Sequence, residues 1–356
     1  MNIENLPITW LLVIFLVAAI AIWIAGIKLS FTTDILVTRF KMGEAMGGLL
    51  ILAIVTNLPE IAIVGGASLE HKMGIAIGNI LGGIAIQTVV LVILDKFGLG
   101  KANSLTYKAS SLVLVLEGTL VVAVLALVIA GHELPAKVIF WRMTPPGILI
   151  LVFWVIGILL ISKARTQLPW IANFTVPGMQ KEPHGHSRKK VDEKAMKRQM
   201  TTSKVIIIFV VSSIITLVAG VALERSGDAI ATQIGMGGVL FGATILAAAT
   251  ALPEISTGLA SIKLKDYQMA VSDIFGGNAF LPVLFLFATL LSGTAVLPEA
   301  QKSDIYLTGL AMLLTIVYVW GLLFRPKKQY ASMGLDSILV LVLYIAGIAG
   351  LFFITS

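Results

Sequence analysis

The sequence predicts an all-α polytopic membrane protein of ten transmembrane helices, arranged as two inverted five-helix repeats. Three observations support this fold class. The 356-residue chain is 58% hydrophobic and 13% charged, and its long uncharged runs can cross a bilayer. Its Lys and Arg residues are concentrated in alternate loops. A short motif containing proline and glutamate occurs twice, 194 residues apart.

Ten apolar segments are long enough to span, since a transmembrane helix needs ~20 residues. Several are longer than this, as tilted or interrupted helices are. The predicted spans are residues 8–29, 44–68, 73–94, 108–131, 144–162, 204–223, 237–262, 268–292, 304–324 and 335–355.

The distribution of basic residues predicts the orientation. With the N-terminus outside, the loops after the odd-numbered spans face the cytoplasm. Of the 26 Lys and Arg residues, 21 lie in these loops or at the adjoining span ends. Because cytoplasmic loops are enriched in Lys and Arg, this bias supports the orientation and an even number of spans. A compact chain with a short linker and no basic leader or transit peptide suits a prokaryotic inner (plasma) membrane.

The chain is expected to divide into three parts. Residues 1–162 form the first five-helix repeat, 163–203 a basic cytoplasmic linker, and 204–356 the second repeat. The charge of the linker follows from its cytoplasmic location. A contact with anionic lipid or a regulatory element is the alternative.

Residues 42–87 align with residues 236–281 without a gap, with 16 identities in 46 positions. Matched proline, glutamate and paired glycines in one frame are harder to obtain by chance than matched Leu or Ile. Each half has five spans, so the second half enters the membrane from the opposite side. Two such halves are related by a pseudo-two-fold axis in the membrane plane, an arrangement that supports alternating access.

Each repeat places one acid deep in the membrane. The motifs are Thr56-Asn57-Leu58-Pro59-Glu60 and Thr250-Ala251-Leu252-Pro253-Glu254, and both acids are expected within roughly 5 Å of the midplane. A carboxylate in the hydrocarbon core is costly, which makes it a candidate functional group. Proline cannot donate a backbone hydrogen bond, so the carbonyls of Val55 and Ala249 are free to coordinate a cation. Carboxylate, hydroxyl and carbonyl oxygens are the ligands of hard cations.

The third and eighth spans contain small and polar residues at matched positions. Small residues allow helices to approach closely. The intramembrane Asn79 and its counterpart Asp273 are expected to face the bundle interior. The candidate packing residues are Gly82, Gly83, Gly276 and Gly277.

These motifs resemble those of the cation/calcium exchanger superfamily, in particular its sodium/calcium exchanger branch. That branch pairs Gly-Thr-Ser-x-Pro-Glu with Gly-Asn-x-x-Gly-Ser-Asn on the next helix, in each of two repeats. The resemblance implies that Glu60 and Glu254 are the two central metal-coordinating carboxylates, with Thr56 and Thr250 as adjacent ligands. It extends over both repeats, the ten spans and the central loop.

The chain departs from this pattern, mainly in the second repeat. The serine before Leu-Pro-Glu is replaced by Asn57 and Ala251, and the serine of Gly-Ser-Asn by glycine in both copies. One turn later stand Gln87, which offers an amide oxygen, and Leu281, which offers none. Fewer oxygens favour fewer ion sites. The candidate cation ligands are Glu60, Glu254, Thr56, Thr250, Asn57, Gln87, Asn79 and Asp273.

Glu117 is a further acid in the middle of a predicted span. It could act as an additional cation ligand or proton relay, or as a hydrogen-bonded acid at a helix contact. The repeat frame places Ala311 opposite it, so no matched acid decides between these alternatives.

The resemblance implies a secondary antiporter that exchanges Ca²⁺ or a related cation for Na⁺ or H⁺. The alternatives are a proton/monovalent-cation exchanger without calcium selectivity and a non-transporting family member. No cofactor is expected, and the partners are inorganic cations and membrane lipid, not nucleic acid. An intramembrane enzyme is disfavoured because the chain has no cysteine and its four histidines lie outside the predicted spans.

Overall fold

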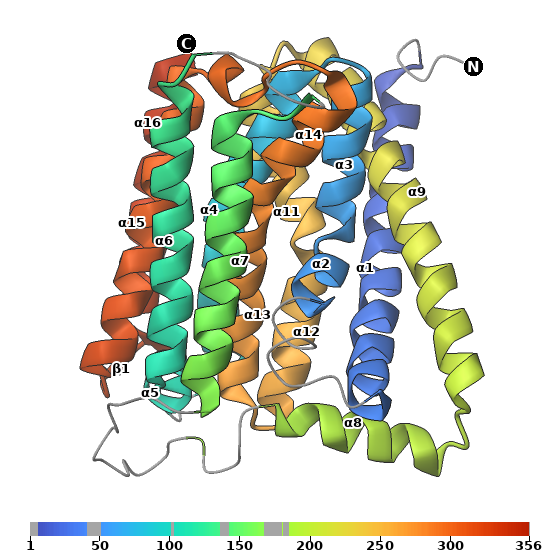
Figure 1. Ribbon diagram of the computed structural model, residues 1–356, viewed down its shortest axis with the longest axis vertical. Helices are drawn as coiled ribbons and strands as arrows, with labels where there is room; N and C mark the ends of the chain where they lie inside the picture. Colours follow the sequence, from blue (N-terminus) through green and yellow to red (C-terminus); the bar gives the residue numbers. More distant parts are fainter. Residues whose placement is uncertain are drawn as a thin grey trace.

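The computed structural model describes residues 6–40, 51–100, 103–135, 142–166, 180 and 185–355. Within these residues the protein consists almost entirely of helices, most of them upright and side by side (Figure 1). α1 begins at the same end of the bundle at which α16 ends (Figure 1). The first-half helices are α1 (Ile8–Arg39), α2 (Leu52–Thr56), α3 (Leu58–Leu69), α4 (Met73–Gly98), α5 (Leu105–Ala109), α6 (Leu112–His132) and α7 (Pro145–Thr166).

The part of the chain after α7 begins with the short polar helix α8 (His186–Lys197). A two-residue hairpin of β1 (Gln329–Tyr330) and β2 (Met333–Gly334) precedes the last helix. The remaining elements are α9 (Thr202–Ile234), α10 (Gly238–Phe241), a π-helix (Gly242–Leu246), α11 (Ala247–Thr250), α12 (Leu252–Lys263), α13 (Tyr267–Phe280), a 3₁₀ turn (Leu281–Val283), α14 (Leu284–Ser292), a second 3₁₀ turn (Leu297–Glu299), α15 (Lys302–Phe324) and α16 (Leu335–Thr355).

Eight of the described spans are long and apolar enough to cross a membrane, and the bent segment Gly242–Lys263 would make a ninth. The predicted second span is described only from Ile51 onward, as α2 and α3, because its residues 44–50 lie outside the described part. The aligned Met42, Gly43 and Gly48 also lie outside it. The described residues therefore confirm an all-α membrane protein without fixing the count at ten.

The proline motif interrupts both matched helices, as the sequence predicts. The first break is at Asn57, with φ −90° and ψ 18°, and the second is at Ala251, with φ −78° and ψ 0°. The two helical parts of the second copy meet at 45°. Each glutamate therefore lies in the first turn of the helix that follows a break.

Several helix ends differ from the predicted ones. α1 continues to Arg39, and α9 continues to Ile234, well past residues 29 and 223. Hydropathy ends the predicted spans before the charged residues of these extensions. In the structure, charged residues of both extensions form ion pairs with other parts of the protein, which stabilises the longer helices. Arg39 donates to Asp192 of α8 at 2.8 Å, and Asp228 of α9 pairs with Lys72 at 2.7 Å.

α8 is a second difference, because the segment 163–203 was predicted as a linker. It lies across the end of the bundle at which α1 ends and α9 begins (Figure 1). Its first turn is attached to the α12–α13 turn: the Ser187 hydroxyl donates to Asp266 at 2.8 Å, and the His186 ring lies 2.9 Å from the Leu264 carbonyl. The predicted linker residues 167–179 and 181–184 lie outside the described part.

Glycines bring the interrupted helices against their neighbours. A Cβ on Gly82 of α4 would collide with the backbone of Ala243, and one on Gly242 would lie 3.2 Å from the backbone nitrogen of Asn79. The packing role predicted for Gly82 is thus supported by the structure. The first helices of the two halves pack extensively against each other, and α9 also packs along α3.

Candidate cation-binding site

Glu60 lies at the break in the first half, with no exposed surface. Its Oε1 accepts a hydrogen bond from the Gln87 amide of α4 at 3.2 Å, while its Oε2 has no partner. The hydroxyl of Thr250, from the second half, lies close enough to the Glu60 carboxylate to influence its charge. The two halves therefore meet at Glu60.

Glu254 lies at the equivalent break in the second half and is 2% exposed. Neither of its carboxylate oxygens accepts a hydrogen bond. The charges of Glu60 and Asp273 both act directly on Glu254. The two matched acids are therefore within electrostatic range of each other inside the bundle.

Side chains from α4 and from the α2–α3 break complete the first half of the site. Gln87 donates both to Glu60 and to the Asn57 oxygen, each at 3.2 Å, and the Asn57 amide donates to the Ala53 carbonyl at 2.7 Å. Asn79 is fully buried, and neither its amide nitrogen nor its oxygen has a partner. Asn57 and Gln87 thus lie at Glu60, as predicted.

Asp273 of α13 lies on the Glu254 side of the site. The Thr257 hydroxyl donates to its Oδ2 at 2.8 Å, and its Oδ1 has no partner. The charges of Asp34 and Arg188 also act on it. Asp273 is therefore within electrostatic range both of Glu254 and of Arg188 in α8.

Two further buried polar residues, which were not among the predicted ligands, link α4 to α13. The Asn278 amide of α13 donates to the Thr88 hydroxyl of α4 at 3.1 Å, and the Asn278 oxygen has no partner. A signal was present in the sequence, since Asn278 occupies the asparagine position of the Gly-Ser-Asn element. Its repeat counterpart is Ile84, so a search for matched polar pairs does not find it.

The remaining predicted ligands are oriented by their own helices. Thr56 donates to the Leu52 carbonyl at 3.0 Å, and Thr250 donates to the Ala247 carbonyl at 3.1 Å. Each hydroxyl oxygen keeps a lone pair with which it can accept or coordinate. Coordination by the Val55 and Ala249 carbonyls stays a prediction.

The matched glycines face different surroundings. A Cβ on Gly277 would lie 2.9 Å from the Asn57 amide nitrogen and 3.4 Å from the Gln87 oxygen. One on Gly83 would meet only the Leu281 methyl group, at 3.5 Å. Gly276 lines a separate small cavity instead. Of these three glycines, Gly277 is therefore the one that borders the polar side chains Asn57 and Gln87.

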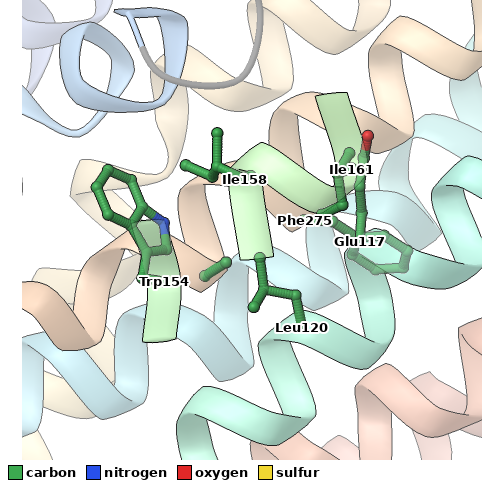
Figure 2. A pocket seen from close by; sticks show the side chains of 8 residues that line it. Glu117, Leu120, Trp154, Ile158, Ile161 and Phe275 are labelled. Atoms are coloured by element: carbon green, nitrogen blue, oxygen red, sulfur yellow. The ribbon is translucent and has the colours of Figure 1, made fainter. Parts of the chain in front are cut away.

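Glu117 is separate from this cluster and forms an ion pair. Arg165 of α7 donates to Glu117 at 2.7 Å and to Ser272 of α13 at 3.1 Å, and the two charged side chains are only 9% and 1% exposed. Figure 2 shows Glu117 beside the apolar residues Leu120, Trp154, Ile158, Ile161 and Phe275, which line a cavity of about 10 Å³. The ion pair supports the helix-contact alternative for Glu117.

The two acids and the polar residues on α4 and α13 have more unpartnered oxygens than unpartnered donors. These buried oxygens come from both halves of the chain, whereas a stable apolar core satisfies its polar groups. Two carboxylates can balance one divalent cation or two monovalent ones, and amide oxygens can complete the coordination of a hard cation. These oxygens are Glu60 Oε2, both Glu254 oxygens, Gln87 Oε1, Asn79 Oδ1, Asp273 Oδ1 and Asn278 Oδ1.

The comparison with protein families decides the class. The model of the family described as sodium/calcium exchanger protein matches residues 10–170 and 204–353. The chain belongs to this family. This confirms the resemblance drawn from the two motifs, and the match covers both repeats on either side of the predicted linker. Membership places the chain among cation exchangers, which are transporters and not enzymes.

One curated protein and two solved structures are similar to this chain. Inner membrane protein YrbG of Escherichia coli (strain K12) is 24% identical over 294 residues, which cover 82% of this chain and 83% of that protein. The H⁺/Ca²⁺ exchanger CAX superposes with a TM-score of 0.68 at 14% identity, covering 97% of this chain and 86% of CAX. The sodium-calcium exchanger NCX_Mj superposes with a TM-score of 0.58 at 18% identity, covering 96% and 98%. At these identities the two structures show a shared fold.

Proposed function

We propose that this exchanger is a secondary active antiporter that moves Ca²⁺, or a related cation, in exchange for Na⁺ or H⁺ by alternating access. The observation that supports this most strongly is the meeting of Glu60 and Glu254, from opposite halves, in a buried cluster of unpartnered oxygens. One Ca²⁺ would neutralise both carboxylates. Two monovalent cations would do the same on the return step, so either occupant balances the charge of these two carboxylates.

The proposed ligands lie at the two helix breaks and on the helices that follow them. Thr56, Thr250 and Asn57 lie at the helix breaks, Gln87 and Asn79 on α4, and Asp273 on α13. Because a carboxylate in the hydrocarbon core is costly unless paired, binding should be strongest where both acids are ionised. Leu281 and the two glycines remove side-chain oxygens, which favours a small number of ions per cycle.

The topology proposed for this reaction has ten spans, with the N-terminus outside a prokaryotic inner membrane. α2–α3 and Gly242–Lys263 would then be the interrupted spans that carry the acids. Discontinuous helices near the midplane are typical binding elements of transporters with inverted repeats. The distribution of Lys and Arg supports this orientation.

The proposal is tested by flux of labelled Ca²⁺ into proteoliposomes under an imposed Na⁺ gradient or an imposed proton gradient. We expect uptake under at least one gradient and its loss in Glu60→Gln and in Glu254→Gln. Glu133→Gln is the matched control, since its side chain is 80% exposed beyond the end of α6. Absence of Ca²⁺ uptake under both gradients would reject calcium exchange.

A second candidate is a proton/monovalent-cation exchanger, which the loss of ligand oxygens at Leu281, Gly83 and Gly277 favours. It predicts Na⁺ or K⁺ flux against a pH gradient without Ca²⁺ movement. A non-transporting protein would show no flux, and cation-dependent thermal stabilisation would then be unchanged by Glu60→Gln or Glu254→Gln.

A further inference from the structure

Glu224 of α9 is a buried acid that does not belong to the central cluster. The residue has no exposed surface, and neither of its carboxylate oxygens has a hydrogen-bond partner. An isolated ionised carboxylate is costly in such surroundings. The ionised form of Glu224 therefore needs a proton or a counter-charge supplied from outside the bundle.

A polar stripe on α9 places Glu224 in line with the central acids. Residues four apart lie on one face of a helix, and this face carries Thr216, Gly220, Glu224 and Asp228. A Cβ on Gly220 would lie 3.1 Å from the Pro59 carbonyl, immediately before Glu60. The stripe therefore follows α3 away from the site.

Contacts farther along α3 fix the level of Glu224. Its Oε2 lies 3.4 Å from the position that a Cβ on Gly66 would occupy. Gly66 follows Glu60 by six residues, which correspond to ~9 Å along a helix. Glu224 thus lies between the central site and the end of the bundle at which α3 ends.

Charged, partly exposed groups lie at that end of the stripe. Lys72 pairs with Glu70 at 2.8 Å and with Asp228 at 2.7 Å, and Arg225 pairs with Glu70 at 2.8 Å. Their side chains are between 22% and 49% exposed. The charges of all four residues act on Glu224, while residues 8–27 of the neighbouring α1 contain no titratable side chain.

We propose that Glu224 is a proton-binding site that exchanges its proton with solvent through the Glu70–Asp228 end of the α3–α9 interface. The proton adds to one carboxylate oxygen from water and returns to water when Glu224 ionises. A proton suits this position better than a metal ion, because a metal ion requires several oxygens. The side chain of Val221, which lies beside the same part of Gly66 as Glu224 does, supplies no oxygen.

Infrared difference spectroscopy between acidic and alkaline pH tests this in a Glu60→Gln/Glu254→Gln background. The background cannot be expected to transport, so the result is independent of the proposed exchange reaction. Protonated carboxyl groups have a carbonyl stretch separate from that of carboxylates. We expect Glu224→Gln, added to this background, to remove the signal of one titrating carboxyl group. Glu224→Asp should retain that signal at a displaced frequency.

Identical spectra with and without Glu224→Gln would overturn the proposal, since Glu224 would then never change its protonation state. Should the glutamine variant not fold, an unshifted spectrum in Glu224→Asp has the same meaning. A third arm adds Na⁺ at constant pH. A Na⁺-dependent carboxylate shift that disappears with Glu224→Gln would also overturn the proposal, in favour of a sodium site. Glu133→Gln, at an 80% exposed side chain beyond the end of α6, is the matched control and should retain the Glu224 signal.

Discussion

Asn57 shows how one half of the site compensates for a residue missing from the other. On sequence grounds, Gly277 is a lost serine oxygen. In the structure, the Asn57 amide nitrogen and the Gln87 amide oxygen lie next to Gly277, and Gln87 links Asn57 to Glu60. The polar group is therefore supplied from across the interface, which a comparison of each repeat with the family pattern cannot reveal.

This contact predicts different effects at matched glycines. Gly277→Ala forces the Asn57 amide to move, and overpacking of this kind costs about 1–3 kcal/mol. We expect roughly tenfold weaker cation binding, since 1.4 kcal/mol corresponds to about a tenfold change. Gly83→Ala should change binding little, because its Cβ would make an ordinary contact with Leu281 at 3.5 Å. Cation-dependent thermal shifts of both variants measure the difference, and equal shifts would contradict it.

Glu70 gives a pH dependence outside the spans. The hydrogen bond from Lys72 lowers the pKa of Glu70 from its ordinary value of 4.5. A lowered pKa in the folded state means that Glu70 stabilises the protein above pH 4.5, and that this contribution is lost as the pH falls below that value.

We therefore expect Glu70→Gln to lower the melting temperature at neutral pH and to have a decreasing effect as the medium is acidified below pH 4.5. Melting curves of both proteins across this range measure the effect. Glu133→Gln, at an 80% exposed side chain, should follow the wild-type curve. A difference between wild type and Glu70→Gln that grew toward low pH would refute the assignment.

At the scale of elements, the sequence predicts the helix breaks correctly because proline lacks the backbone N–H that continuous helices need. It does not predict the π-helix at Gly242–Leu246, whose residues have ordinary helical composition. Nor does it predict α8, because that helix is polar and is ordered by contacts with Asp34, Arg39 and Asp266 from distant segments. Hydropathy reports lipid contact and carries no information about these partners.

The Glu117–Arg165 pair fastens α6 and α7 to α13 and yields an element-scale prediction. Removing one partner of a buried ion pair typically costs about 3–5 kcal/mol, because the other charge stays buried. Arg165→Met should therefore lower the melting temperature strongly. Combining it with Glu117→Leu should restore part of the loss. Cation-dependent stabilisation should persist in the folded double variant, and its disappearance would show that Glu117 is a ligand after all.

At the scale of the whole molecule, the repeat frame is the most informative sequence feature. It places matched residues at matched helix breaks, and the structure brings those breaks together from opposite halves. Individual polar residues such as Asn278 are less predictable, because a polar group can stand in one repeat without a polar counterpart in the other. Symmetry therefore locates the site better than it identifies its members.

The proposed orientation gives a topology prediction that suits a chain without cysteine. Single cysteines can be introduced without removing native ones. A membrane-impermeant maleimide applied to intact cells should label His71→Cys, between α3 and α4, and spare Lys328→Cys, between α15 and α16. Permeabilised cells should show labelling at both positions. The reverse pattern in intact cells would invert the orientation.

Two glycines in the repeat frame cross over between the halves. Gly26 of α1 rests on Pro253, and Gly220 of α9, its counterpart 194 residues later, rests on Pro59. Each leading helix thus touches the kink of the opposite repeat instead of its own. A rigid shift of the α1–α9 pair would press on one kink while relieving the other. Bulky replacements at Gly26 and at Gly220 would then have opposite effects, because each would hinder access to the site from a different face of the membrane.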